Sequence, residues 1–169
     1  EIDALGGQTG IVSDKTAIQF RMLNRSKGPA MWSPRVQSDR MKFIGAWREI
    51  IENTPNLDMW QDMVTELICN GSTISGVKTG MGVEFHSKAV ILTNGTFLNG
   101  LIHIGKVQIG GGRVSEPASY GMSEQLRDMG FTTDRMKTGT PVRIDSRSVD
   151  FSLLEEQKGD VDFHKFSSL

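Results

Sequence analysis

The fold prediction starts from the stretch AVILTNGT, residues 89–96, which changes from apolar to polar at its midpoint. Residues 89–92 are continuously apolar and partly β-branched, a pattern typical of a strand that is covered on both faces. Residues 93–96 are small and polar around a glycine, so a ligand can approach the backbone there. In open α/β sheets, ligands bind at the carboxyl ends of strands. The stretch therefore indicates an α/β fold of α+β character and, at 93–96, either a ligand-binding strand end or an ordinary turn.

Three short strands are predicted just upstream. Residues 64–69 and 74–79 contain β-branched residues and are separated by Asn-Gly-Ser, a turn signal. Glycines at 80 and 82 lead into residues 83–86, so the three segments predict a β-meander. Before them, apolar residues recur at steps of three and four, which predicts a helix over roughly residues 34–53 that begins at Ser33-Pro34.

Glycine dominates the sequence downstream, and residues 99–119 predict a loop. Within it, Gly110-Gly111-Gly112-Arg113 can bring backbone N–H groups close to an anion, with the guanidinium as a bidentate partner. A flexible surface loop explains the same composition. A short helix capped by Ser123 is predicted over residues 124–129, followed by a possible strand over 131–136.

The charge of the chain is balanced overall but uneven along it. The 19 Lys and Arg residues and 20 Asp and Glu residues give −1, which excludes an overall basic nucleic-acid binder. Residues 15–48 nevertheless hold eight basic residues and one acid, a net charge of +7. This stretch predicts either a solvated helix face with a polar loop or a surface for phosphates of a nucleotide or RNA. The RNA or anion contacts predicted within it are Arg21, Arg25 and Lys27.

A second basic feature lies near residue 140. Lys137 and Arg143 flank Thr-Gly-Thr-Pro, and they predict either an anion site or a plain charged turn.

Length and cysteine content limit the class of protein. The 169 residues fit about one domain, and no apolar run reaches the roughly 18 residues that a membrane helix needs. Cys69 is the single cysteine, which excludes a disulfide framework and a cysteine-based zinc site, so we expect no metal site and a reduced, cytoplasmic setting. The chain begins at Glu1 without a methionine, and we expect an internal segment of a longer protein.

Long motifs, taken in order along nearly the whole chain, resemble the glucose-inhibited division protein A family of tRNA uridine 5-carboxymethylaminomethyl modification enzymes. The matching motifs are LGG (5–7), IQFRMLNRSKGPA (18–30), AVILTNGTFLNG (89–100), IHIG (102–105), GGR (111–113), KTGTPVRID (137–145) and VDFS (149–152). The resemblance implies an FAD enzyme of the glutathione-reductase-like class. With a GTPase partner, such an enzyme builds an aminomethyl-type group on C5 of the wobble uridine of tRNA. It also implies NADH as reductant, a folate one-carbon donor and a homodimeric parent protein.

The resemblance carries specific residues with it. Those that match cofactor-contacting or cleft segments of the family are Val64, Thr93, Asn94, Gly95, Thr96, Gly111, Gly112, Arg113 and Ser119. Residues 1–110 then form part of an FAD-binding domain with the basic loop, helix and meander. Residues 111–169 form the cleft loop, a short helix and the start of an inserted region. No catalytic residue is assigned.

Three features of the family are expected to lie outside this chain. They are the glycine-rich dinucleotide fingerprint, the two cysteines linked to the chemistry and the helical region that binds the GTPase. We therefore expect the chain alone to be catalytically inactive and to bind FAD weakly or not at all. Two other functions stay open. One is that of the related folate- and FAD-dependent tRNA uridine-5-methyltransferase, and the other is a non-enzymatic RNA-binding module.

Overall fold

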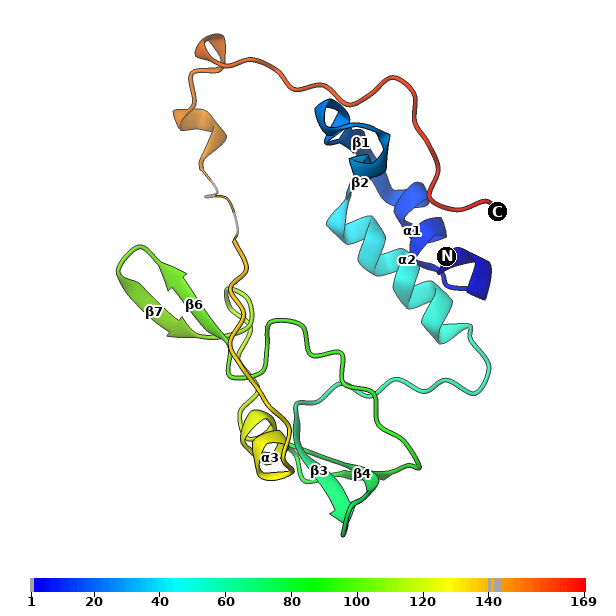
Figure 1. Ribbon diagram of the computed structural model, residues 1–169, viewed down its shortest axis with the longest axis vertical. Coiled ribbons are helices and arrows are strands. Elements are labelled where there is room, and N and C mark those ends of the chain that lie inside the picture. The colour runs from blue at the N-terminus through cyan, green and yellow to red at the C-terminus, as the bar shows by residue number, and fades with distance from the viewer. Residues whose placement is uncertain (1, 140, 142–143) are drawn as a thin grey trace. The chain divides into compact units, whose positions relative to one another are not determined.

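The computed structural model describes residues 2–139, 141 and 144–169, and the chain forms two compact units (Figure 1). The first unit comprises residues 1–59 and 142–169, and the second comprises residues 60–141. The predicted boundary after residue 110 lies within the second unit and stays a prediction. The described part of the chain is mixed α/β, with three α-helices and small antiparallel sheets. None of those helices combines the length and apolar character that crossing a membrane requires.

The first unit combines two helices with a two-stranded sheet. Strand β1 follows helix α1 directly, pairs antiparallel with β2, and α1 contacts α2. In chain order its elements are α1 (Thr9–Thr16), β1 (Ala17–Leu23), β2 (Ser33–Ser38) and α2 (Arg40–Glu52).

The predicted start of the second helix is wrong. Ser33 and Pro34 belong to β2, because pairing with β1 fixes their backbone as extended. Helix α2 begins after Asp39, whose carboxylate accepts hydrogen bonds from the N–H groups of the second and third helical residues at 2.9 and 3.1 Å. An N-cap of this kind stabilises a helix by about 1 kcal/mol. The apolar residues that predicted the helix do lie within α2.

Phe20 is the centre of the first unit's core and is only 3% exposed. The rings of Phe163 and Phe166 meet it edge-on, with centroids 5.4 and 6.1 Å away. The backbone N–H of Asp160 donates to Phe20 O at 2.8 Å. The C-terminal tail therefore lies along β1 and ends beside α1 (Figure 1), where the Asp14 carboxylate accepts from the N–H of Phe166 at 2.9 Å.

The second unit contains the predicted β-meander, which is confirmed. Strands β3, β4 and β5 are neighbours in that order and antiparallel. The Gln125 side chain bonds both the N–H and the C=O of Leu67 at 2.7 Å, which fixes helix α3 on β3. The elements of the unit are β3 (Val64–Asn70), β4 (Thr73–Thr79), β5 (Glu84–His86), β6 (Leu101–Ile104), β7 (Val107–Gly110) and α3 (Met122–Asp128).

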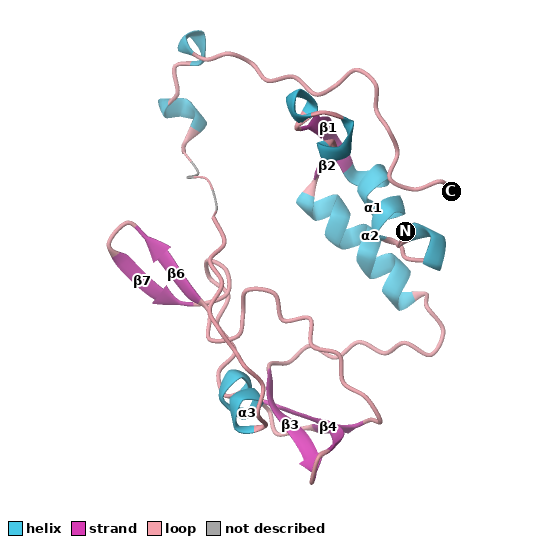
Figure 2. Cartoon of the chain, in the orientation of Figure 1, coloured by secondary structure: helices cyan, strands magenta, loops and turns pink. Residues whose placement is uncertain are grey.

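Residues 89–92 do not form the predicted strand. No described segment pairs with them, they are drawn as loop in Figure 2, and Ile91 is 86% exposed. Apolar composition indicates that a segment prefers burial, but a strand also needs a neighbour for its backbone hydrogen bonds. The same composition therefore leaves an exposed apolar segment here.

Three further predictions for the second unit need correction. Residues 99–119 are not all loop, because β6 and β7 form a hairpin whose turn has Gly105 at φ +59°. Helix α3 has Gly121 as its N-cap in place of Ser123, since Glu124 accepts from the Gly121 N–H at 3.2 Å. Residues 131–136 form no strand.

Candidate functional site

The candidate site lies where two loops of the second unit, residues 93–100 and 110–121, bond to each other; we call them the interlocked loops. The hydroxyl of Thr96 donates to Gly112 O at 2.8 Å, and the N–H of Gly111 donates to Gly100 O at 2.9 Å. The N–H of Ser119 donates to Phe97 O, also at 2.9 Å. Segments that are distant in sequence are therefore fixed side by side.

Glycines make this approach possible. A Cβ on Gly100 would lie 2.5 Å from Gly111 O and 2.6 Å from Thr96 O, and these backbone atoms cannot rotate away. A Cβ on Gly112 would meet the ring of Phe97. The glycine-rich composition therefore serves close packing of backbone on backbone and on an aromatic ring.

Ser119 connects the interlocked loops to strand β3. Its side chain is buried, and its hydroxyl donates to Val64 O at 3.0 Å. Residue 98 and Ser119 also form a parallel bridge. Of the residues that the sequence predicts for a cofactor, Val64, Thr96, Gly111, Gly112 and Ser119 thus belong to one hydrogen-bonded cluster.

The glycine-rich run does not present the free N–H groups predicted for an anion. The N–H groups of Gly111 and Gly112 donate to Gly100 O and Glu116 O, the latter at 3.3 Å. The guanidinium of Arg113, which is half-exposed, lies 3.5 Å from the Glu116 carboxylate. The N–H groups of Gly111 and Gly112 therefore donate to backbone oxygens of the chain itself and are not available to an anion.

Available donors lie instead in the turn of Thr93, Asn94, Gly95 and Thr96. Among the described residues, none accepts a hydrogen bond from the backbone N–H groups of this turn. Gly95 has φ +53°, and no atom lies within 4 Å of the position a Cβ would take. This exposed turn fits the polar groups of a nucleotide.

A dinucleotide also needs a site for its pyrophosphate, which is usually the N-terminus of a helix that follows a strand and a glycine-rich turn. In the described part of the chain, no helix follows a strand through a short glycine-rich turn, since α3 is separated from β7 by residues 111–121. The described residues therefore offer backbone donors in the turn at 93–96 but no helix N-terminus of this kind for a pyrophosphate.

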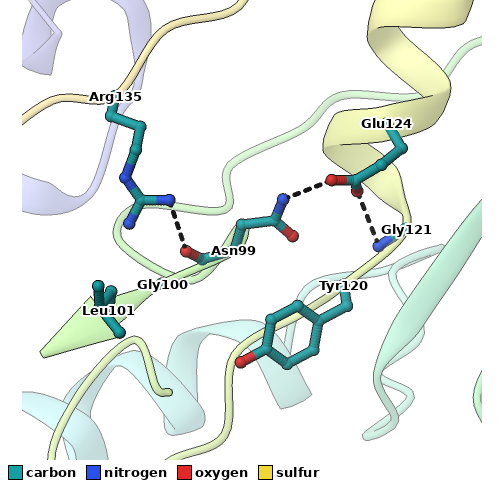
Figure 3. A pocket seen from close by; sticks show the side chains of 7 residues that line it. All are labelled: Asn99, Gly100, Leu101, Tyr120, Gly121, Glu124 and Arg135. Carbon is teal, nitrogen blue, oxygen red and sulfur yellow. Dashed lines mark hydrogen bonds between the residues drawn. The ribbon is translucent and has the colours of Figure 1, made fainter. Parts of the chain in front are cut away.

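An open pocket of about 380 Å³ adjoins the interlocked loops (Figure 3). Asn99, in the left-handed region at φ +46°, donates from its amide to Glu124 at 2.7 Å and accepts from Arg135 on its backbone oxygen at 3.2 Å. The hydrogen bond from Asn99 holds the pKa of the Glu124 carboxyl below its ordinary value, and the charge of Arg127 adds to the effect. Sequence reasoning missed this pocket, since no local spacing links Asn99 to Arg135. Its lining residues are Asn99, Gly100, Leu101, Tyr120, Gly121, Glu124 and Arg135.

The predicted anion contacts of the first unit lie on and beside β1. Arg21 donates to the Gln157 side chain at 2.9 Å, and Arg25 pairs with Asp160 at 3.1 Å. Lys27 is exposed in the short turn after β1. Lys137 is exposed in the second unit, whereas Arg143 lies outside the described residues, so the turn predicted between them is not described as a whole.

Solved structures identify the fold class. The chain is similar to Aquifex aeolicus GidA, with a TM-score of 0.85 and 48% identity over 98% of this chain and 28% of that one. It also resembles the GidA-related protein from Thermus thermophilus, with a TM-score of 0.52 and 27% identity over 57% of this chain and 43% of that one. The chain therefore has the fold of one part of a GidA-type protein.

The family model of glucose inhibited division protein A matches residues 1–169, and the chain belongs to this family. A relative from Parabacteroides distasonis, named tRNA uridine 5-carboxymethylaminomethyl modification enzyme MnmG, is 69% identical over 167 residues. A relative of the same name from Porphyromonas gingivalis is 65% identical over 167 residues. Each match covers 99% of this chain and 27% of the relative, so the chain spans about a quarter of the length of these curated relatives.

Proposed function

We propose that the chain is part of an FAD-dependent enzyme that modifies C5 of the wobble uridine of tRNA with a carboxymethylaminomethyl or aminomethyl group. Family membership and the names of the relatives support this function. The structural observation that supports it most is the hydrogen-bonded cluster around Ser119, which joins residues matched to cofactor contacts from three separate segments.

In this proposal, the interlocked loops form the wall against one side of the FAD nucleotide. The turn of Thr93, Asn94, Gly95 and Thr96 offers its backbone N–H groups to it. Val64 contacts its adenine side, and Ser119 is a further contact. Gly111, Gly112 and Arg113 border the cleft. Bound FAD would supply electron transfer, with NADH as reductant and a folate as one-carbon donor. The phosphate clamp and the contacts with the GTPase and with the second subunit of a homodimer would lie in other parts of the parent protein.

The RNA side of the proposal rests on charge. Arg21, Arg25 and Lys27 lie in the stretch of net charge +7, and they would contact tRNA phosphates. Lys137 and Arg143 would add contacts near the cleft. A cytoplasmic location follows from this function, since tRNA is the substrate.

A segment exchange tests the function. The corresponding segment of the Parabacteroides distasonis relative is replaced by this chain, which is 69% identical to it, and the chimera is expressed in a strain lacking the enzyme. Nucleosides from its tRNA are analysed by mass spectrometry. We expect the carboxymethylaminomethyl or aminomethyl group on wobble uridine.

Two outcomes contradict the proposal. The first is a folded chimera that leaves wobble uridine unmodified while the unexchanged relative, the positive control, modifies it. Formation of 5-methyluridine by the chimera would instead support the methyltransferase alternative.

A further inference from the structure

The turn between β1 and β2, residues 24–32, carries an exposed aromatic side chain and two basic residues, Arg25 and Lys27. Trp32 is 47% exposed, and its indole Nε1 donates to Arg25 O at 3.3 Å. This hydrogen bond fixes the indole at the surface, next to the turn that carries Arg25 and Lys27. Aromatic rings beside basic groups are the contacts that stack unpaired bases and bind the adjoining phosphates.

The backbone of this turn is ordered by its own hydrogen bonds. Asn24 and Gly28 have φ angles of +60° and +91°, and two short 3-10 helices, Arg25–Lys27 and Pro29–Met31, follow them. The N–H of Lys27 donates to Asn24 O at 2.9 Å, and that of Met31 donates to Gly28 O at 3.0 Å. A preordered turn loses little conformational entropy when a ligand binds.

Basic side chains around the turn outnumber their acidic partners. Arg21 of β1 lies directly opposite Arg35 of β2 in the strand register, a pairing of like charges that destabilises a sheet. Within the described residues, Asp160 is the one carboxylate at ion-pair distance from Arg21, Arg25, Lys27 or Arg35. Such an excess is expected where the protein binds an anion.

We propose that residues 24–32 bind an unpaired nucleotide of the RNA, with its base stacked on Trp32 and its flanking phosphates bound by Arg25 and Lys27. This inference rests on the proposed function for the identity of RNA as substrate. It adds that the turn recognises a single-stranded segment, because the faces of bases within a duplex are already stacked on one another.

The Asp160 carboxylate competes with a phosphate for Arg25 and so lowers the affinity of residues 24–32 for RNA. Its carboxylate accepts from the backbone N–H of Met22 at 2.7 Å and from the guanidinium of Arg25 at 3.1 Å. The guanidinium is 57% exposed, and ion pairs this accessible to water are weak. A phosphate can therefore take the place of Asp160 on Arg25 without disturbing the bond to Met22.

Fluorescence anisotropy of the full chain with two labelled RNAs tests the inference. One RNA is a hairpin with an unpaired loop, and the other is a blunt duplex of the same length. We expect Trp32→Ala to weaken hairpin binding by about 5- to 150-fold, the range for loss of one stacked base, and to leave duplex binding unchanged. Trp32→Phe keeps a ring and should retain most of the affinity.

Two further variants complete the design. Trp32→Leu keeps a large apolar side chain without an aromatic face, so it controls for any effect of Trp32→Ala on folding. It should weaken hairpin binding as much as Trp32→Ala does. Trp60→Ala removes a tryptophan of similar exposure, 57%, that lies in the second unit against Phe85, and it should bind both RNAs like the wild type.

The stacking contact would be overturned if Trp32→Leu and Trp60→Ala changed the affinity for the hairpin equally. It would also be overturned if the Trp32 variants lost as much affinity for the duplex as for the hairpin. Failure of the proposed function can be distinguished from failure of this RNA contact. A chimera that binds the hairpin through Trp32 but leaves tRNA unmodified would reject the enzyme activity and keep the RNA contact.

Discussion

Gly100→Ala perturbs the interlocked loops at their closest point of approach. The new Cβ would be 2.5 Å from Gly111 O and 2.6 Å from Thr96 O, about an ångström inside ordinary contact. Neither neighbour is a flexible side chain, so the two loops must separate. Overpacking of this kind typically costs about 1–3 kcal/mol. The hydrogen bond from the Gly111 N–H to Gly100 O is the first to be lost.

Amide hydrogen exchange measures this separation directly. The N–H groups of Gly111 and Ser119 are protected by bonds to Gly100 O and Phe97 O. A destabilisation of about 1–3 kcal/mol raises the local opening constant, and hence their exchange rates, by about 5- to 150-fold. Gly139→Ala is the control, since no atom lies within 4 Å of its added Cβ. Unchanged exchange in Gly100→Ala, or equal acceleration by both substitutions, would refute the role assigned to these glycines.

The remaining predictions concern the first unit. Asp160→Asn should strengthen RNA binding, because a phosphate no longer competes with the Asp160 carboxylate for Arg25, whereas Asp162→Asn, which removes the same charge from an exposed site, should strengthen it less. Phe20→Ala should destabilise the unit by about 3–5 kcal/mol in urea unfolding, and a loss below about 1 kcal/mol would contradict its place at the centre of three rings. Asp3 has its pKa lowered from 3.8, chiefly by the hydroxyl of Ser167, so the contact is present above pH 3.8 and lost as pH falls through the lower folded pKa. Protection of the C-terminal amides against hydrogen exchange, relative to their intrinsic rates, should fall in that acidic range, and Asp3→Asn should remove this pH dependence.

Sequence patterns correctly predicted the elements whose formation depends on residues close together in the chain. The meander over residues 64–86 follows from β-branched runs separated by turn residues, and each strand pairs with its sequence neighbour. The apolar spacing in 43–51 likewise predicted the body of α2. The N-cap of that helix is Asp39 and not Ser33, because pairing of Ser33 and Pro34 with β1 overrides their helix-start signal.

The rest depends on contacts between distant residues. Asp160 bonds Met22 across 138 positions, and no pattern in either segment reveals the other. Residues 89–92 show the converse, since their composition indicates burial without naming a partner strand. Gly111 and Gly112 were predicted to bind an anion or to lie, like Gly100, in a flexible loop, but their function depends on which backbone approaches them. For the candidate site, the sequence indicated Ser119 and Val64 through family resemblance, whereas the pocket at Asn99 had no sequence signal.

The flavin content of the purified chimera tests the central claim most directly. The segment of the Parabacteroides distasonis relative is replaced by this chain in three forms: unchanged, with Gly100→Ala, and with the control Gly139→Ala. Bound flavin per protein is read from visible absorbance after gel filtration. We expect full occupancy for the unchanged and control segments and a several-fold loss for Gly100→Ala, because the wall against the nucleotide opens. Full flavin occupancy in a folded Gly100→Ala chimera would contradict the assignment of the interlocked loops to the cofactor.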